Sequence, residues 1–122
     1  MKIRIKGNSV RLRLTQSEVD NFSKNGMLEE HTAFGSNELI YALERKAAAD
    51  ELLASFEGNR ITLFVPEKLS TIWTTTDRVG MENLMEIGDG KRLFLLVEKD
   101  WACIDRTDED QSDNYPNPNQ GC

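Results

Sequence analysis

Five basic side chains near the start of the sequence form its strongest candidate for a binding site. They lie in two short runs, KIRIK at residues 2–6 and SVRLRL at 9–14, in which charged or polar residues alternate with apolar ones. In a β-strand, this alternation puts the basic residues of each run on one face. If those faces coincide in a hairpin, like charges repel one another across the ladder, and a bound anion or partner carboxylates would neutralise them. Lys and Arg are the usual donors to phosphate oxygens. The candidate anion-binding residues are Lys2, Arg4, Lys6, Arg11 and Arg13.

A simpler interpretation of the same residues stays open. The cations could pair with strand carboxylates such as Glu82, Glu86 or Glu98, or they could face water, because charged strand faces are usually solvated. The two interpretations differ in where the side chains lie. Convergence in a cavity favours an anion site, whereas ion-paired or solvated cations spread over an outer surface.

The rest of the sequence lacks the residues that catalysis or a metal site would need. His31 is the only histidine, so neither a catalytic triad nor a zinc site has its partners. The carboxylates from Asp105 to Asp113 could hold Ca²⁺ or Mg²⁺, but they do not have the spacing of an EF-hand. Cys103 has no histidine nearby in the sequence to activate it. We therefore expect no catalytic residue, no metal ion and no cofactor.

The composition predicts one soluble domain. The chain has 122 residues, with 15 Lys and Arg against 21 Asp and Glu, which gives a net charge of −6. This acidic balance argues against bulk binding to nucleic acids or anionic membranes. No apolar run approaches the ~18 residues of a membrane span, and no signal peptide is evident, so we expect a cytoplasmic location. Residues 1–104 are expected to form the domain, and residues 105–122 an acidic tail rich in Pro and Asn.

Turn and capping residues predict the elements of the first half. Gly7 and Asn8 tolerate the turn of a hairpin. Thr15 and Glu18 have the spacing of a capping box, which predicts a helix over residues 16–24 that ends at Asn25-Gly26.

The following segments are less clearly patterned. Residues 28–34 are a weaker strand candidate. Residues 38–56 favour a helix by intrinsic propensity, but Leu39, Tyr41 and Leu43 alternate as in a strand. We predict two strands with a loop near residues 46–50.

An internal repeat at an offset of 51 residues supports this choice. Gly58-Asn59 repeats Gly7-Asn8, and the alternating apolar residues after the turn recur. Residues 1–50 and 51–104 each predict a hairpin, a short helix and a second hairpin. The fold class is therefore α+β, mainly antiparallel, with a pseudo-two-fold duplicated eight-stranded barrel or curved sheet and two short helices.

Two resemblances bear on function. The ending from Leu95 to Pro118, with Trp101 and Cys103, resembles small uncharacterised bacterial proteins that have no assigned activity. The duplicated pattern is similar to the CYTH, or triphosphate tunnel, fold, whose enzymes bind polyphosphate with basic side chains and metal with a Glu-x-Glu-x-Lys strand. Here the corresponding strand is KIRIK, in which only Lys6 fits, so the resemblance implies anion binding rather than metal-dependent hydrolysis.

A third, shorter resemblance concerns DNA. The segment from Gly7 to Leu12 resembles the opening of swapped-hairpin antitoxin-like proteins. The leading hypothesis is nevertheless a non-catalytic module that binds a protein partner or a small anionic ligand in the bacterial cytoplasm. A phosphate- or polyphosphate-binding or hydrolysing CYTH-like protein is the alternative. DNA binding is the second alternative.

Overall fold

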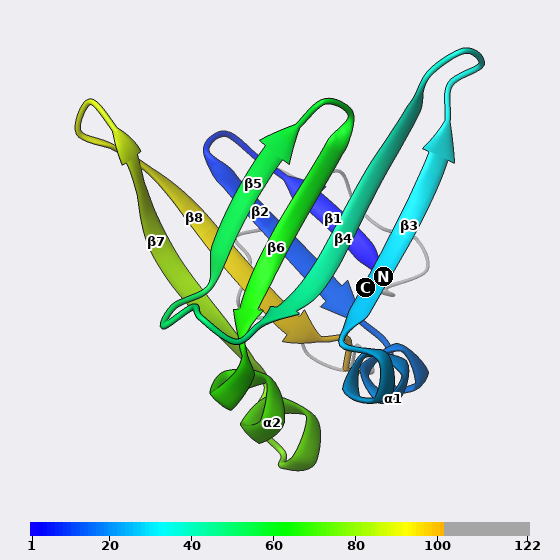
Figure 1. The fold of residues 1–122 in the computed structure, drawn as a ribbon, viewed down its shortest axis with the longest axis vertical. Coiled ribbons are helices and arrows are strands. Elements are labelled where there is room, and N and C mark those ends of the chain that lie inside the picture. The colour runs from blue at the N-terminus through cyan, green and yellow to red at the C-terminus, as the bar shows by residue number, and fades with distance from the viewer. Residues whose placement is uncertain (102–122) are drawn as a thin grey trace, which may run out of the picture.

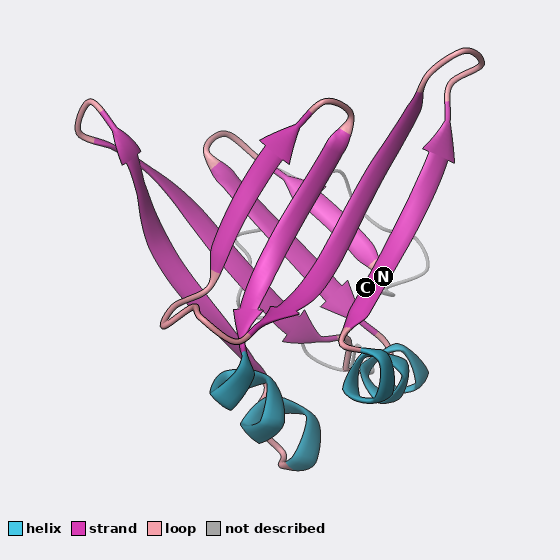
Figure 2. Ribbon diagram, in the orientation of Figure 1, coloured by secondary structure: helices cyan, strands magenta, loops and turns pink. Residues whose placement is uncertain are grey.

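Two four-stranded sheets pack face to face, with two helices at one end of the sandwich and the hairpin turns at the other (Figures 1 and 2). This computed structural model describes residues 1–101. Sheet A has the strand order β1-β2-β8-β7, and sheet B has the order β3-β4-β6-β5. The elements are β1 (Lys2–Ile5), β2 (Ser9–Leu14), α1 (Gln16–Asn25), β3 (Met27–Ala33), β4 (Glu38–Lys46), β5 (Leu53–Glu57), β6 (Arg60–Pro66), α2 (Glu67–Thr75), β7 (Gly80–Gly88) and β8 (Lys91–Lys99). Neither helix in this described part of the chain has the length and apolar character of a membrane span.

The α+β fold class is confirmed, and of the two predicted arrangements, a barrel or a curved sheet, the closed barrel is not formed. Each sheet combines one hairpin from each half of the chain, because each helix carries the chain from one sheet to the other. Within residues 1–101 the two sheets share no strand pairing. Side chains bridge their edges instead: the amide of Asn83 on β7 donates to the carbonyl oxygen of Leu52 at 2.9 Å.

The pairing is mixed rather than antiparallel throughout. All four hairpins are antiparallel, but β2 pairs with β8 and β4 pairs with β6 in parallel. The order β1-β2-β8-β7 in sheet A matches β5-β6-β4-β3 in sheet B, so the two halves share one element order and one pairing scheme.

The ambiguous segment over residues 38–56 contains two strands, β4 and β5, as predicted. Ala42 and Leu43 are fully buried in β4, which is an inner strand of sheet B. Burial between neighbouring strands outweighs intrinsic helix propensity, because that preference amounts to only a few tenths of a kcal/mol per residue, roughly 0.7 at most for ordinary residues.

The core fills the space between the sheets and is closed at one end by the helices. Leu12 and Leu95 from sheet A meet Leu63 from sheet B, and all three are fully buried. Phe22 of α1 and Trp73 of α2, which correspond at the repeat offset, touch edge to face with ring centroids 6.2 Å apart. Contact between these corresponding residues joins the two helices into one cap.

Helix α1 begins as its sequence predicts. The hydroxyl of Thr15 accepts from the backbone N–H of Glu18, and the Glu18 carboxylate accepts from the backbone N–H of Thr15. Gly26 ends the helix with φ 71°, a left-handed conformation that glycine adopts without strain. Pro66 occupies the N-cap position of α2.

Met1 is buried, and its partly buried α-ammonium group contacts side chains of α1 and β3. It donates to the carboxylates of Glu18 and Glu30, and the Tyr41 hydroxyl donates to the Met1 carbonyl oxygen at 3.0 Å. Burial lowers the pKa of this ammonium, but the hydrogen bonds and charges of the two carboxylates outweigh it and raise the pKa above 8.0. Burial likewise opposes ionisation of Glu18, but the ammonium and Thr15 hold its pKa below 4.5.

This buried contact predicts a pH-dependent loss of stability in the variant Glu30→Gln. The raised pKa means that folding gains from the protonated ammonium below about pH 8 and loses that gain as the pH rises through the folded-state pKa. We expect Glu30→Gln to lower the free energy of unfolding by about 1 kcal/mol at pH 7, after allowance for solvent screening. The difference should shrink as the pH rises above 8 in urea titrations. Glu44→Gln is the control, and a difference constant with pH would contradict the expectation.

Candidate binding surface

The outer face of sheet A gathers the predicted basic residues. In the β1–β2 register, Lys2 lies opposite Arg13 and Arg4 lies opposite Arg11. Leu12 and Leu14 are fully buried and point to the core, so the alternating Arg11 and Arg13 point outward. The two basic strand faces therefore coincide. Lys6 follows β1 in the hairpin turn and is exposed. We call this surface the basic face; it consists of Lys2, Arg4, Lys6, Arg11 and Arg13.

Two of these cations have the carboxylate partners that the simpler interpretation expects. The guanidinium of Arg13 donates from Nε and Nη2 to Glu98 Oε1 at 3.0 and 2.8 Å. Lys2 Nζ lies 3.3 Å from Asp100 Oδ2. For Lys6 and Arg11, residues 1–101 supply no ion-pair partner. The repulsion across the ladder is therefore neutralised only in part by strand carboxylates.

An apolar strip lies beside the basic residues on the same outer face. The register aligns Ser9 of β2 with Phe94 of β8 and Leu84 of β7, and it aligns Arg11 with Leu96. Leu84 is 51% exposed, and Phe94 and Leu96 are half-buried. No helix or strand of residues 1–101 covers this face. A basic strip next to an apolar strip suits a ligand that has both acidic and apolar groups.

The five basic residues do not converge in a cavity. They extend along two neighbouring strands on the outside of the sheet, because the inward positions of β1 and β2 are occupied by the core residues Ile3, Val10 and Leu12. These residues therefore do not form a tunnel of the kind that the CYTH resemblance implies, and their spread over the outer surface is the arrangement that the simpler interpretation expects.

Comparison with protein families assigns the chain to a family but gives it no activity. The model described as "Family of unknown function (DUF7009)" matches residues 1–119. The chain belongs to this family. No curated protein and no solved structure matches the chain. The prediction of an uncharacterised family is confirmed, and nothing found supports the predicted likeness to the CYTH fold.

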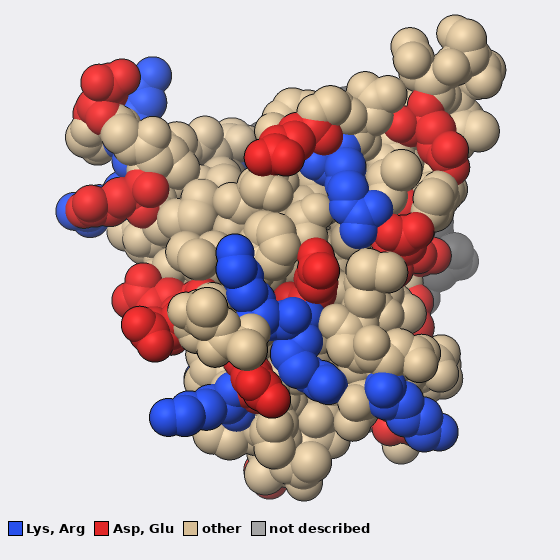
Figure 3. Space-filling view, viewed as in Figure 1, with Lys and Arg blue, Asp and Glu red and all other residues tan. Residues whose placement is uncertain are grey.

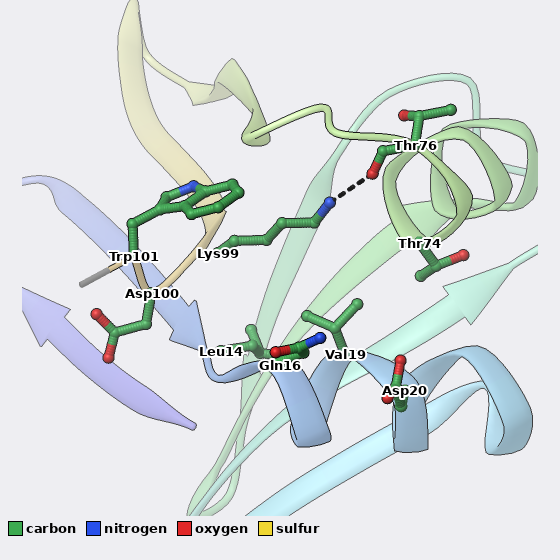
Figure 4. Close-up of a pocket in the computed structure, with 9 residues that line it drawn as sticks. All are labelled: Leu14, Gln16, Val19, Asp20, Thr74, Thr76, Lys99, Asp100 and Trp101. Carbon is green, nitrogen blue, oxygen red and sulfur yellow. Dashed lines mark hydrogen bonds between the residues drawn. The ribbon is translucent and has the colours of Figure 1, made fainter.

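The sequence did not reveal a cavity of about 430 Å³ where α1 begins, α2 ends and β8 ends (Figure 4). Lys99 extends beside Trp101 and donates from Nζ to the carbonyl oxygen of Thr76 at 2.8 Å. Trp101 is 55% exposed. The lining residues are Leu14, Gln16, Val19, Asp20, Thr74, Thr76, Lys99, Asp100 and Trp101. They come from three segments far apart in the chain, so no local pattern in the sequence could have grouped them.

The only histidine lies in an exposed charged network on the outer face of sheet B. His31 lies 2.9 Å from Glu29 and 2.6 Å from Glu38, and Arg60 donates to Glu29 at 2.7 Å. Hydrogen bonds that the imidazole ring donates to Glu29 and Glu38 raise the pKa of His31 above 6.5. Figure 3 shows basic and acidic side chains interspersed on this side of the molecule. The basic and acidic side chains of this network pair with one another, as expected of an exposed, structural histidine.

Several residues considered above lie outside the described part of the chain. The acidic stretch from Asp105 to Asp113 and both cysteines, Cys103 and Cys122, belong to this group. Trp73, in contrast, is described and is fully buried in the core.

Proposed function

We propose that the protein is a non-catalytic binding module that holds an acidic polypeptide segment of a partner on the basic face. The observation that carries this proposal is Arg11, which lies opposite Arg4 on a sheet face that no described element covers and has no ion-pair partner among residues 1–101. Like charges in that position oppose folding. An acidic partner would turn the repulsion into attraction.

The spacing of the cations suits an extended peptide. Alternate residues of a strand lie roughly 7 Å apart, so Lys2, Arg4 and Lys6 present charges at regular intervals along β1. Arginine also offers a planar fork that accepts a carboxylate with two hydrogen bonds. The neighbouring strip of Phe94 and Leu96 supplies apolar area for the partner's uncharged side chains.

A phosphate or polyphosphate ligand is the second candidate, and the opposed arginines Arg4 and Arg11 favour it in the same way. The open surface suits a long ligand better than a compact triphosphate, because the five cations do not converge.

DNA binding ranks third because the chain carries a net charge of −6. A bacterial cytoplasmic location and an origin of the two halves by duplication belong to the same proposal; the shared pairing scheme supports the duplication.

Calorimetric titration of the full chain with hexaglutamate, tripolyphosphate and duplex DNA at low salt tests this proposal. We expect hexaglutamate to bind, and the double variant Arg4→Ala/Arg11→Ala to weaken its affinity by about tenfold or more, because each arginine contributes a charge-assisted hydrogen bond. The control Lys68→Ala/Lys91→Ala removes equal charge from outside the basic face. Equal losses in both variants, or no binding of hexaglutamate, would overturn the proposal. Binding of tripolyphosphate alone would favour the phosphate candidate instead.

A further inference from the structure

The chain leaves β8 at the edge of the basic face. The backbone N–H of Asp100 donates to the carbonyl oxygen of Leu14 at 2.7 Å, which extends the parallel pairing of β8 with β2 by one step. The Asp100 carboxylate lies 3.3 Å from Nζ of Lys2, the first cation of β1. Residues that follow Asp100 therefore start next to Lys2.

The sequence after this point is complementary in charge to the basic face. Residues 101–122 contain five acids against the single cation Arg106. The acids are Asp105, Asp108, Glu109, Asp110 and Asp113. The basic face has five side chains of opposite sign, of which Arg13 and Lys2 also contact Glu98 and Asp100.

We propose that the acidic segment 105–113 of the same chain binds the basic face and competes there with the partner. This inference rests on the proposed function, because it assigns the same surface to a tethered ligand. The segment acts as an internal mimic of an acidic partner and keeps the face occupied when no partner is present.

The reach of the segment fits this assignment. An extended chain spans at most about 3.5 Å per residue, so the five steps from Asp100 to Asp105 cover up to ~17 Å. The four steps from Lys2 to Lys6 cover roughly 13 Å. Segment 105–113 can therefore lie over the whole length of β1, with Lys2 nearest to the point where the chain leaves β8.

Tethering makes even a weak contact effective. A short flexible linker gives its segment an effective concentration on the order of 1 mM at the neighbouring site. If the free segment binds with a dissociation constant of about 0.1 mM, the tether lowers the apparent affinity for an external ligand by about tenfold. Raised salt weakens the contact, because exposed charges are screened.

The experiment compares two full-chain variants that each remove five negative charges. The tail variant combines Asp105→Asn, Asp108→Asn, Glu109→Gln, Asp110→Asn and Asp113→Asn. The control variant combines Glu44→Gln, Asp50→Asn, Glu57→Gln, Asp77→Asn and Asp89→Asn, none of which lies on the basic face. Backbone amide NMR spectra report on β1 and β2, and titration with hexaglutamate reports on competition.

We expect the tail variant to shift amide signals of β1 and β2 and to bind hexaglutamate about tenfold more tightly than the natural chain. The control variant should produce neither change. High salt should move the natural chain's signals towards those of the tail variant. Unshifted signals in β1 and β2, or an equal gain of affinity in both variants, would overturn the inference.

The same two measurements distinguish failure of the proposed function from failure of this inference. If hexaglutamate binds to none of the chains but the β1 and β2 signals still shift in the tail variant, the internal contact stands and the external partner is wrong. If hexaglutamate binds equally to all three chains and the signals do not shift, the external partner stands and the internal contact is wrong.

Discussion

Replacing Trp73 by alanine is expected to lower the free energy of unfolding by about 3–5 kcal/mol. Trp73 is fully buried and packs edge to face against Phe22, so its removal leaves a cavity between the two helices. Its indole N–H donates to the carbonyl oxygen of Val79 at 3.0 Å, and the substitution removes this hydrogen bond while the bond from the Lys99 backbone N–H to the same oxygen remains. The lost ring contact is one of the contacts between the two halves of the chain.

Urea unfolding followed by circular dichroism measures this loss, and Ile72→Ala is the matched control. Ile72 precedes Trp73 in the same helix but is 44% exposed, so its truncation should cost less than about 1 kcal/mol. Similar losses in the two variants would show that the end of the sandwich is not held by the Phe22–Trp73 contact. If Trp73→Ala does not fold, Trp73→Phe provides a measurable intermediate loss, because it keeps most of the ring contact but not the hydrogen bond.

Much of the fold could be predicted because its signals are local. The alternation in residues 2–6 and 9–14 and the turn at Gly7-Asn8 together determine the register that puts Arg4 opposite Arg11. The capping box at Thr15 likewise depends on residues three apart. These features need no knowledge of the rest of the chain.

The features that could not be predicted depend on contacts between distant segments. The parallel pairing of β2 with β8 joins residues more than eighty positions apart, and no pattern in either strand identifies the other. The apolar strip beside the basic face follows from this pairing, because Leu96 becomes a neighbour of Arg11 only there. The hydrogen bond from the Met1 ammonium to Glu30 has the same origin.

The candidate binding surface thus combines a predictable half with an unpredictable one. The first hairpin supplies the cations, and the last hairpin supplies Phe94, Leu84 and the carboxylate of Glu98. Strand β7 packs closely against β8 at Glu98, the residue that pairs with Arg13. This contact therefore affects both the stability of sheet A and the net charge of the basic face.

The substitution Gly80→Ala is expected to lower the free energy of unfolding by about 2–3 kcal/mol and to disturb the Arg13–Glu98 ion pair. Gly80 lies opposite Glu98 in the β7–β8 register. A Cβ atom at position 80 would lie 3.0 Å from the Glu98 Cα atom and even closer to the carbonyl oxygen of Val97. Alanine is intrinsically better than glycine in a strand by roughly 0.5–1 kcal/mol, but a clash with backbone atoms outweighs that gain, because it cannot be relieved by a side-chain rotation.

Urea unfolding and NMR of the Arg13 guanidinium test the two effects of Gly80→Ala. Glu82→Ala, two residues along the same strand and exposed on the same face, is the control and should change stability by less than about 0.5 kcal/mol. If the strands must separate to admit the new methyl group, the Glu98 carboxylate moves with β8 and its hydrogen bonds to Arg13 weaken. An increase in stability for Gly80→Ala would mean that β7 and β8 can move apart without loss, and that this close contact does not position Glu98 against Arg13.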